Sequence, residues 1–269
     1  MCAKVNQIFL SGKRVLLHAM VTDDWFLDWF NSNYYHLLYK HRDEQEADEL
    51  IRNLIIHLKP HPGSRMVDVA CGKGRHSKIL SDYGFDVTGI DLSASSIQAA
   101  SLMENDRLHF LQHDMRNLFW VNYFDYAFNF FTSFGYFRTR REHDNAIRSL
   151  ARSLKKGGKI IIDYINVPKA AQQPPQTYLQ VEEAEKVTFQ IAKWQDETHF
   201  YKQIQIKNSP EGALRHLYTE KVAKFTLHDF SEMLGYYGLQ MQEIFGDYQL
   251  NAYDLHHSER MIMIATKIK

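Results

Sequence analysis

The stretch VDVACGKGRHS, residues 67–77, contains the residue types of a tight ligand-binding turn. Gly72 and Gly74 have no side chains, so the backbone there can turn sharply and approach a bound molecule closely. The apolar run RMVDVA leads into the glycines and a helix-like segment, RHSKILSDY, follows them. Turns of this kind in open α/β sheets bind nucleotide-shaped ligands beyond the carboxyl ends of the strands. The pattern therefore predicts such a ligand at this turn.

Three acidic residues follow apolar runs or lie inside them, where they could bind parts of that ligand. Asp68 precedes Gly72 by four residues, Asp91 ends the run FDVTGID, and Asp114 follows the run LHFLQ. A carboxylate at the end of a second strand accepts hydrogen bonds from ribose hydroxyls in NAD sites. The third glycine of a dinucleotide fingerprint is absent, because Ser77 stands in its place. A pyrophosphate-binding turn is therefore disfavoured.

The glycine turn and the three acids, in this order, resemble the motifs of class I S-adenosylmethionine-dependent methyltransferases. The resemblance covers residues 25–166 and 224–269 approximately. It implies S-adenosylmethionine as the cofactor, with Asp68 and the glycines at its methionine end, Asp91 at the ribose and Asp114 at the adenine amino group. The cofactor-binding residues expected on this basis are Asp68, Ala70, Gly72, Gly74, Arg75, Asp91, Leu92, Asp114, Met115 and Phe130.

The elements that position these residues alternate between helical and strand patterns. Residues 25–58 and 141–156 have helical patterns, and Gly157-Gly158 is expected to end the second helix. Strand-like runs lie at 65–70, 85–91, 108–115, 126–131, 159–166, 239–248 and 259–268. This order predicts an α/β fold: a Rossmann-like, doubly wound, mostly parallel seven-stranded sheet. Between about 176 and 224 the period is near two, which predicts an antiparallel β insertion. We expect a single domain over 23–269 and a poorly ordered extension over 1–22.

The acceptor of the methyl group is expected near aromatic residues at the mouth of the site. The candidates are Tyr34, Tyr35, Tyr39, Phe131, Phe134 and Tyr136, although such aromatic residues also commonly pack in cores. The family places D/N-P-P-Y after strand four when it methylates adenine or amide nitrogens, and NFFT at 129–132 lacks both prolines. The chain looks more similar to the N- or O-methyltransferases of small molecules. No side chain stands out as a general base.

Composition limits the possible partners. The 32 basic and 32 acidic residues cancel, which disfavours nucleic acid as a partner, and no apolar run approaches the ~20 residues of a membrane span. The two cysteines, Cys2 and Cys71, indicate a reducing, cytoplasmic location. His113, His256 and His257 fit no metal-ligand spacing, so no metal is expected.

Three other functions remain open at this stage. The run Arg138-Thr139-Arg140-Arg141 could bind an anionic acceptor or RNA, or simply form a solvated helix start, so an RNA methyltransferase is one alternative. An NAD-dependent oxidoreductase with a degenerate fingerprint is the second. A non-catalytic cofactor-binding partner subunit is the third.

Overall fold

The structure is a computed structural model that describes residues 9–10, 13–14, 25–39, 44–182 and 186–268. Its helices are α1 (Trp25–Phe30), α2 (Asn33–Leu38), α3 (Glu44–Leu58), α4 (Arg75–Asp82), α5 (Ala94–Ala100), α6 (Arg140–Ser153), α7 (Val167–Ala170) and α8 (Leu227–Tyr236). Its strands are β1 (Phe9–Leu10), β2 (Lys13–Arg14), β3 (Arg65–Val69), β4 (Asp86–Asp91), β5 (Leu108–Gln112), β6 (Phe124–Asn129), β7 (Leu154–Ile165), β8 (Gln176–Glu182), β9 (Val187–Gln195), β10 (His199–Lys207), β11 (Leu214–Ala223), β12 (Leu239–Phe245) and β13 (Arg260–Lys267).

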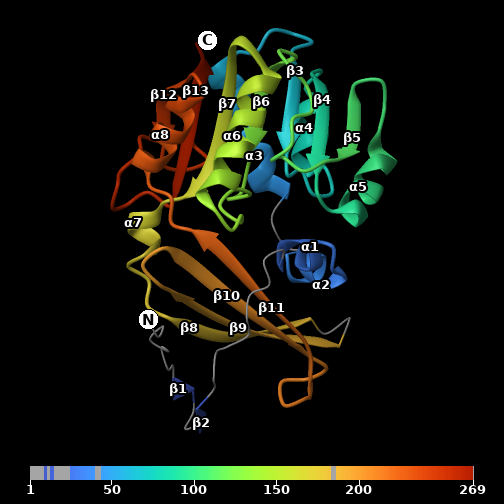
Figure 1. The fold of residues 1–269 in the computed structure, drawn as a ribbon. Helices are drawn as coiled ribbons and strands as arrows, with labels where there is room; N and C mark the ends of the chain where they lie inside the picture. Colours follow the sequence, from blue (N-terminus) through green and yellow to red (C-terminus); the bar gives the residue numbers. More distant parts are fainter. Residues whose placement is uncertain (1–8, 11–12, 15–24, 40–43, 183–185, 269) are drawn as a thin grey trace.

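The larger sheet has seven strands in the order β12-β13-β7-β6-β3-β4-β5 (Figure 1). Strands β3 to β7 run parallel, whereas β13 is antiparallel to both β7 and β12. The predicted fold class is therefore confirmed. The strand order reverses between β3 and β6, and ligands of doubly wound sheets bind at such a reversal. The glycine turn directly follows β3 and lies at this point.

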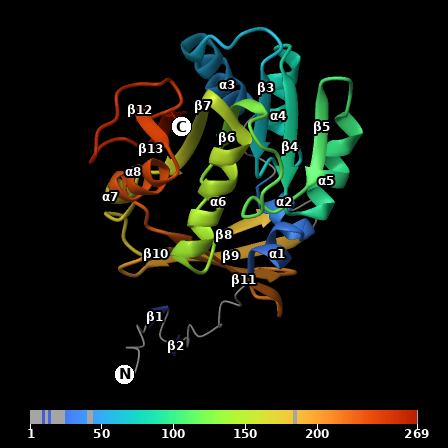
Figure 2. The ribbon, with the colours of Figure 1, turned by 45° about the horizontal axis from the view of Figure 1, so that its top comes forward.

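Helices cover both faces of this sheet because successive residues of a buried strand point to opposite sides. Met66 packs in one apolar cluster with Leu54 of α3, while Val67 packs in another with Ile147 of α6 and Phe230 of α8. Figure 2 shows α6 and α8 lying over the same face. The alternation along each strand thus produces two separate cores.

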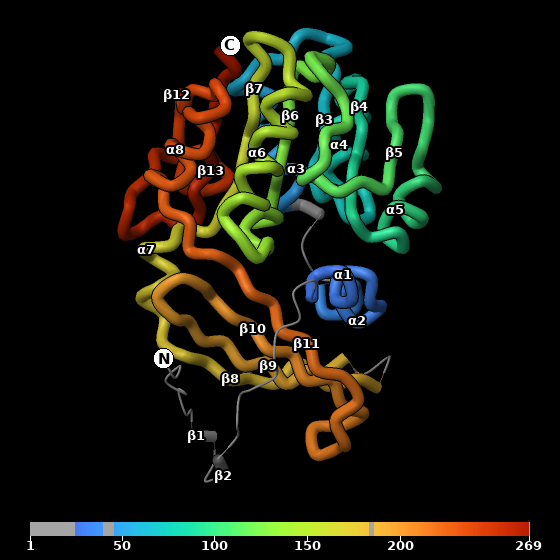
Figure 3. Tube along the Cα trace, viewed as in Figure 1, coloured from blue at the N-terminus to red at the C-terminus, as the bar shows by residue number. Residues whose placement is uncertain are grey.

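The smaller sheet is antiparallel, in the order β11-β10-β9-β8. It lies across one end of the larger sheet, with α1 and α2 between the two sheets on one side and α7 on the other (Figures 1 and 3). Phe189 and Ile204 on its inner face are fully buried in the cluster that also contains Trp29 of α1. The ring of Trp29 lies 4.7 Å from that of Tyr218 on β11. Helix α1 therefore joins the smaller sheet to the rest of the core.

The helix predicted over 141–156 is wrong at its carboxyl end. Helix α6 stops at Ser153, and Leu154 is already extended and paired with Phe124 of β6. Leu154 is completely buried, and the adjoining Lys155 ammonium binds Asp125 at 2.7 Å. The free energy gained by burying Leu154 in the sheet exceeds the gain from one more helical turn. The chain therefore enters β7 at Leu154, and Gly157 and Gly158 lie within that strand.

The helical pattern predicted over 25–58 contains a break. Residues 31–32 separate α1 from α2, and the Ser32 hydroxyl caps α2 by accepting a hydrogen bond from the Tyr35 amide at 3.1 Å. The extension predicted over 1–22 falls largely outside the described residues, of which 9–10 and 13–14 form a short antiparallel pair. The single-domain assignment stays a prediction. No helix in the described ranges is both long and apolar enough to cross a membrane.

Candidate active site

The glycine turn between β3 and α4 contains three residues with left-handed backbone: Ala70 (φ 61°), Gly72 (φ 56°) and Gly74 (φ 80°). A Cβ atom at position 74 would lie 2.5 Å from the ring of Phe110 on β5, whereas a Cβ at position 72 would meet nothing within 4 Å. Gly74 therefore lets α4 pack against β5. Gly72 leaves its backbone open toward a neighbouring cleft.

Asp68 lies in β3, two residues before Ala70 at the start of this turn, and is only 1% exposed. One of its carboxylate oxygens accepts a hydrogen bond of 2.6 Å from the Ser77 hydroxyl on α4. Burial raises the pKa of Asp68 to about 6, and the negative charge of Asp91 acts in the same direction. This carboxyl group therefore changes its ionisation within the range of ordinary assay buffers.

Asp91 ties the end of β4 to the glycine turn. Its two oxygens accept hydrogen bonds from the backbone amides of Ser93 at 2.7 Å and Gly72 at 2.8 Å. Burial raises its pKa, although these hydrogen bonds oppose the shift. The amides hold the carboxylate in one orientation, and each oxygen keeps a lone pair for a further donor.

Asp114 is paired with Arg116, a residue that the sequence patterns did not single out. The Arg116 guanidinium donates to both Asp114 oxygens, with a shortest distance of 2.7 Å, and also binds Glu142 at 2.8 Å. Burial acts to raise the pKa of Asp114, but the hydrogen bonds and charge of Arg116 outweigh it and lower the pKa. The carboxylate stays ionised, and any adenine amino group would share its oxygens with Arg116.

The turn lies in a cleft, and we name this cleft the glycine-turn cleft. It consists of two adjoining hollows that share Tyr35, Tyr39, Ala70, Gly72, Phe131 and Ser133. The first encloses about 910 Å³ of space, part of it open to solvent, and is lined also by Phe26, Phe30, Ile90, Asp91, Leu92, Ser96, His113, Asp114, Met115, Tyr136, Phe137 and Glu220. The second is lined also by His36, Asp68, Cys71, Lys73, Arg75, His76 and Phe130.

The cleft brings together all the predicted cofactor residues except Gly74, which is buried against Phe110. Of the predicted acceptor residues, Tyr35, Tyr39, Phe131 and Tyr136 line the cleft. The roles assigned to these residues remain predictions.

Two of the predicted acceptor residues, Phe134 and Tyr34, do not line the cleft. Phe134 is 1% exposed and packs against Phe230 in the core, because its position after the turn directs it inward. Tyr34 lies with its ring 5.0 Å from that of His216 on β11 and lines neither hollow. It is on the side of α2 that faces the smaller sheet.

The turn after β6 is held in a strained conformation by a buried acid. Phe131 and Thr132 have φ values of 55° and 57°, in the left-handed region that side chains disfavour. The Asp163 carboxylate, fully buried on β7, accepts a hydrogen bond from the Phe131 amide at 2.8 Å and pairs with Arg260 at 2.7 Å. Arg260 also donates to the Thr132 hydroxyl at 2.9 Å. This arrangement presents the Phe131 ring to the cleft.

The basic run at 138–141 forms the start of α6. Thr139 and Glu142 make a reciprocal capping box, and Arg140 pairs with Asp144 and Asp229. None of these residues lines the glycine-turn cleft. The structure therefore favours the helix-start interpretation of this run.

A second cavity, the inter-sheet pocket, lies between the end of β7, helix α7 and the smaller sheet. It is lined by Ile165, Lys169, Ala170, Gln173, Pro174, Gln176, Lys193, Trp194, Gln195, Phe200, Tyr201, Lys202, Glu220, Val222, Glu259 and Arg260. Among the described residues, Glu220 is the one that lines both this pocket and the first hollow of the cleft. It therefore stands where the two cavities meet.

Glu220 is oriented by two donors on the amino-terminal helices. Its Oε1 atom accepts hydrogen bonds from the Tyr39 hydroxyl at 2.7 Å and from the Trp29 indole at 2.8 Å. Among the described residues, its Oε2 atom has no hydrogen-bond partner. The Tyr39 hydroxyl in turn accepts from Lys202 at 2.6 Å. Sequence patterns could not identify Glu220, because no motif surrounds it and its partners are about 180–190 residues away.

The remaining candidates do not form a site. Within the ranges that the structure describes, no group of three or more His, Cys, Asp and Glu side chains is arranged to hold a metal. Cys71 is a buried free cysteine, and burial raises the pKa of its thiol well above the usual value. It therefore stays protonated and packs as a small apolar side chain.

Comparisons with known proteins agree with this geometry. Residues 66–158 match the methyltransferase domain family. The putative methyltransferase YqeM of Bacillus subtilis (strain 168) is 28% identical over 211 residues, which cover 76% of this chain and 85% of that protein. A dTDP-3-amino-3,4,6-trideoxy-alpha-D-glucopyranose N,N-dimethyltransferase of Streptomyces venezuelae is 30% identical over 136 residues, covering 49% of this chain and only 56% of that protein.

A solved structure extends the agreement to the fold. CalS10, described as an amino pentose methyltransferase from Micromonospora echinaspora with S-adenosylmethionine bound, matches with a TM-score of 0.64 at 19% identity. The match covers 88% of this chain and 97% of CalS10. This match concerns the fold alone. Together with the family match, the glycine turn identifies a methyltransferase domain of the class I, S-adenosylmethionine-dependent type in this chain.

Proposed function

We propose that this enzyme methylates a nitrogen or oxygen atom of a small-molecule acceptor. The observation that carries the proposal is Glu220, a fixed carboxylate at the junction of the glycine-turn cleft and the inter-sheet pocket. A small molecule in the inter-sheet pocket would have its reacting end at this carboxylate. The names of the Streptomyces venezuelae relative and of CalS10, both acting on amino sugars, support an acceptor of this size.

Residues of the cleft fit the cofactor at several points. Gly72 leaves room for a close approach, since a Cβ there would meet nothing within 4 Å. Asp91 is held by two amides in an orientation that leaves lone pairs for ribose hydroxyls. Asp68 and Arg75 line the second hollow, where the methionine carboxylate and ammonium groups would bind. Leu92 and Met115 line the first hollow and would cover the adenine.

S-adenosylmethionine supplies a methyl group on a positively charged sulfur. The acceptor atom forms a bond to the methyl carbon while the carbon–sulfur bond breaks, and the electron pair of that bond goes to sulfur. The acceptor proton passes to the carboxylate of Glu220. Tyr35, Tyr136 and Phe131 present aromatic rings to the cleft, and such rings favour a neighbouring cation. The protein aligns the two reactants and excludes water, which is the main requirement of an in-line displacement.

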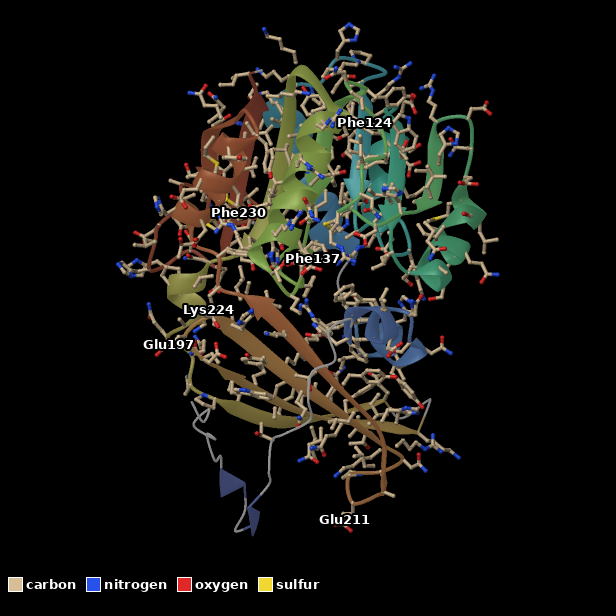
Figure 4. All side chains as sticks on the ribbon, viewed as in Figure 1. Phe124, Phe137, Glu197, Glu211, Lys224 and Phe230 are labelled. Atoms are coloured by element: carbon tan, nitrogen blue, oxygen red, sulfur yellow. The ribbon has the colours of Figure 1, made fainter. Side chains whose placement is uncertain are left out.

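The test uses S-adenosylmethionine with a deuterated methyl group and a matched pair of acceptors, glucosamine and N-acetylglucosamine. Mass spectrometry of the products reports which acceptor gains a methyl group. We expect Glu220→Gln to lower kcat at least tenfold while the affinity for S-adenosylhomocysteine stays the same. Glu211→Gln is the matched control, because Glu211 lies at the far tip of the same sheet (Figure 4) and is exposed.

Three results would contradict the proposal. Methyl transfer to RNA with no transfer to any small amine or hydroxyl compound would make the enzyme an RNA methyltransferase. Full activity of Glu220→Gln would remove Glu220 from the reaction. Binding of S-adenosylhomocysteine without transfer to any acceptor would indicate a non-catalytic subunit. We also propose a cytoplasmic location, which the free thiol of Cys71 supports.

A further inference from the structure

Arg260 and Glu220 line the inter-sheet pocket from two different sheets. Arg260 is the first residue of β13 and is paired with Ile165 at the end of β7, so it belongs to the wall on the side of the larger sheet. Glu220 lies in β11 of the smaller sheet. A molecule in this pocket therefore has a guanidinium group from one sheet and a carboxylate from the other within the same cavity.

One edge of the Arg260 guanidinium is fixed by the protein. Its Nε atom donates to the Asp163 carboxylate at 2.7 Å, and its Nη2 atom donates to the Thr132 hydroxyl at 2.9 Å. Asp163 is fully buried, and its negative charge balances that of Arg260. A guanidinium group is planar and rigid, so these two hydrogen bonds also fix the direction of its remaining N–H groups.

The Nη1 group of Arg260 is available for a further acceptor. Within the described ranges of the chain, no residue accepts a hydrogen bond from Nη1, which carries two N–H donors. The side chain is 19% exposed, so a ligand can reach it. Because Arg260 lines the inter-sheet pocket, a molecule in that pocket can bind to these donors.

Arg260 also connects the inter-sheet pocket to the turn after β6. Thr132, which accepts a hydrogen bond from Nη2, follows Phe131 in this turn. The Phe131 amide donates to the same Asp163 carboxylate that pairs with Arg260. The Phe131 ring lines the glycine-turn cleft. A molecule bound to Nη1 is therefore held in a fixed position relative to the cleft.

We propose that Nη1 of Arg260 binds an oxygen atom of the acceptor, in a hydroxyl or a carboxylate group, while the reacting atom of the acceptor lies at Glu220. The inference rests on the proposed function, since it names a second group that the acceptor carries. Because Asp163 already balances the charge of Arg260, Nη1 can bind a neutral hydroxyl as well as a carboxylate. The acceptor is then a small amine or hydroxyl compound with a further oxygen atom on the side that faces the larger sheet.

The test compares three cyclic amines by isothermal titration calorimetry, with the wild-type protein saturated with S-adenosylhomocysteine. Glucosamine carries hydroxyl groups, 3-aminocyclohexanecarboxylate carries a carboxylate, and cyclohexylamine carries neither. A hydrogen bond from a charged group predicts that one of the first two binds about tenfold or more tightly than cyclohexylamine. Tighter binding of glucosamine would indicate a hydroxyl group, and tighter binding of the carboxylate compound would indicate a carboxylate.

Arg260→Lys then tests whether Arg260 causes this preference. Lysine keeps a positive charge for Asp163 but has no Nη1 group. We expect the affinity for the preferred amine to fall about tenfold or more, while the affinities for cyclohexylamine and S-adenosylhomocysteine stay the same. Arg148→Lys is the matched control, because Arg148 is exposed on α6 and lines neither the pocket nor the cleft. The comparison of the three amines needs no variant, so it tests the proposal even if Arg260→Lys is unstable.

The outcomes separate this proposal from the proposed function. Equal affinities of the wild-type protein for the three amines, or no binding of any of them, would overturn the role of Arg260 even if methyl transfer occurs. Equal affinities of Arg260→Lys and Arg148→Lys for the preferred amine would overturn it as well. Binding that depends on Arg260, without methyl transfer to any small molecule, would contradict the proposed function and leave the Arg260 site in place.

Discussion

The pKa of Asp68 predicts how the binding of the cofactor product changes with pH. The carboxyl group is buried and its pKa is raised to about 6. If the ionised form binds the ammonium group of S-adenosylhomocysteine, about one molecule in ten is competent at pH 5 and about nine in ten at pH 7. We expect the affinity at pH 5 to be about tenfold lower than at pH 7, a difference of about 1.4 kcal/mol.

The assay is isothermal titration calorimetry at pH 5, 6 and 7 with the wild-type protein and Asp68→Asn. Asparagine can keep the hydrogen bond with Ser77 but does not ionise, so the variant should bind more weakly and lose the tenfold dependence on pH. A wild-type affinity that does not change with pH would refute the reasoning. A pH dependence that persists in Asp68→Asn would show that another group, such as Asp91, controls it.

The raised pKa also affects the stability of the protein without ligand. The folded state holds the Asp68 proton more tightly than the unfolded state, whose value is 3.8. The contribution of Asp68 to stability is therefore fully present below about pH 4 and falls as the pH rises to about 6, by about 3 kcal/mol. Chemical denaturation should show that Asp68→Asn lacks this decrease.

Three further predictions concern the framework of the site. Gly74→Ala should lower the free energy of unfolding by about 2–4 kcal/mol in thermal scans, because its Cβ would lie 2.5 Å from Phe110. Asp163→Asn leaves the Arg260 guanidinium buried without its ion pair, and urea unfolding should show a loss of about 3–5 kcal/mol; adding Arg260→Met should restore part of it. Burial lowers the pKa of His143 to about 4, so stability present above pH 6.5 should fall by about 3 kcal/mol as the pH drops toward 4, and His143→Phe should remove that decrease.

Each of these has a result that would contradict it. For Gly74→Ala that result is a stability within about 0.5 kcal/mol of the wild-type protein, the range of neutral surface changes. For Asp163→Asn it is a double variant no more stable than the single one. For His143→Phe it is an acid-induced decrease equal to that of the wild-type protein.

The part of the site on the larger sheet could be predicted from the sequence because its determinants are local. Asp68 and Gly72 are four residues apart, and Asp91 ends its own strand, so each residue is positioned by the element that contains it. The alternation of side chains between the two faces of a strand is likewise set by the local sequence. So are the residues that end most of the helices. The exception, the end of α6 at Ser153, arises where the sheet buries Leu154 in competition with the helix.

The proposed acceptor side, at Glu220 and Phe131, could not be predicted from the sequence, because the residues that position it come from distant segments. Glu220 depends on Trp29 and Tyr39, and the strained turn at Phe131 depends on Asp163 and on a partner from the last strand. Composition cannot separate an aromatic residue that faces a cleft from one that packs in a core. This explains why the sequence predicts an acceptor contact for Phe134 as well as for Phe131, although Phe134 packs in the core.

The attachment of the smaller sheet has a consequence for how such enzymes diversify. Its strands form one contiguous stretch of sequence, 176–223, so recombination can exchange the whole smaller sheet in a single event. The end of β11 is attached to the larger sheet by specific hydrogen bonds. The Tyr164 hydroxyl donates to the Ala223 carbonyl, and the Ala223 amide donates to the carbonyl of Gly135. A Cβ at position 135 would collide with Tyr164, whose hydroxyl oxygen would lie only 2.3 Å away. We therefore expect a smaller sheet taken from one enzyme to fit only a recipient enzyme that keeps the tyrosine and the glycine of this contact. The presence of both residues is a criterion for choosing the two parents of a chimeric enzyme.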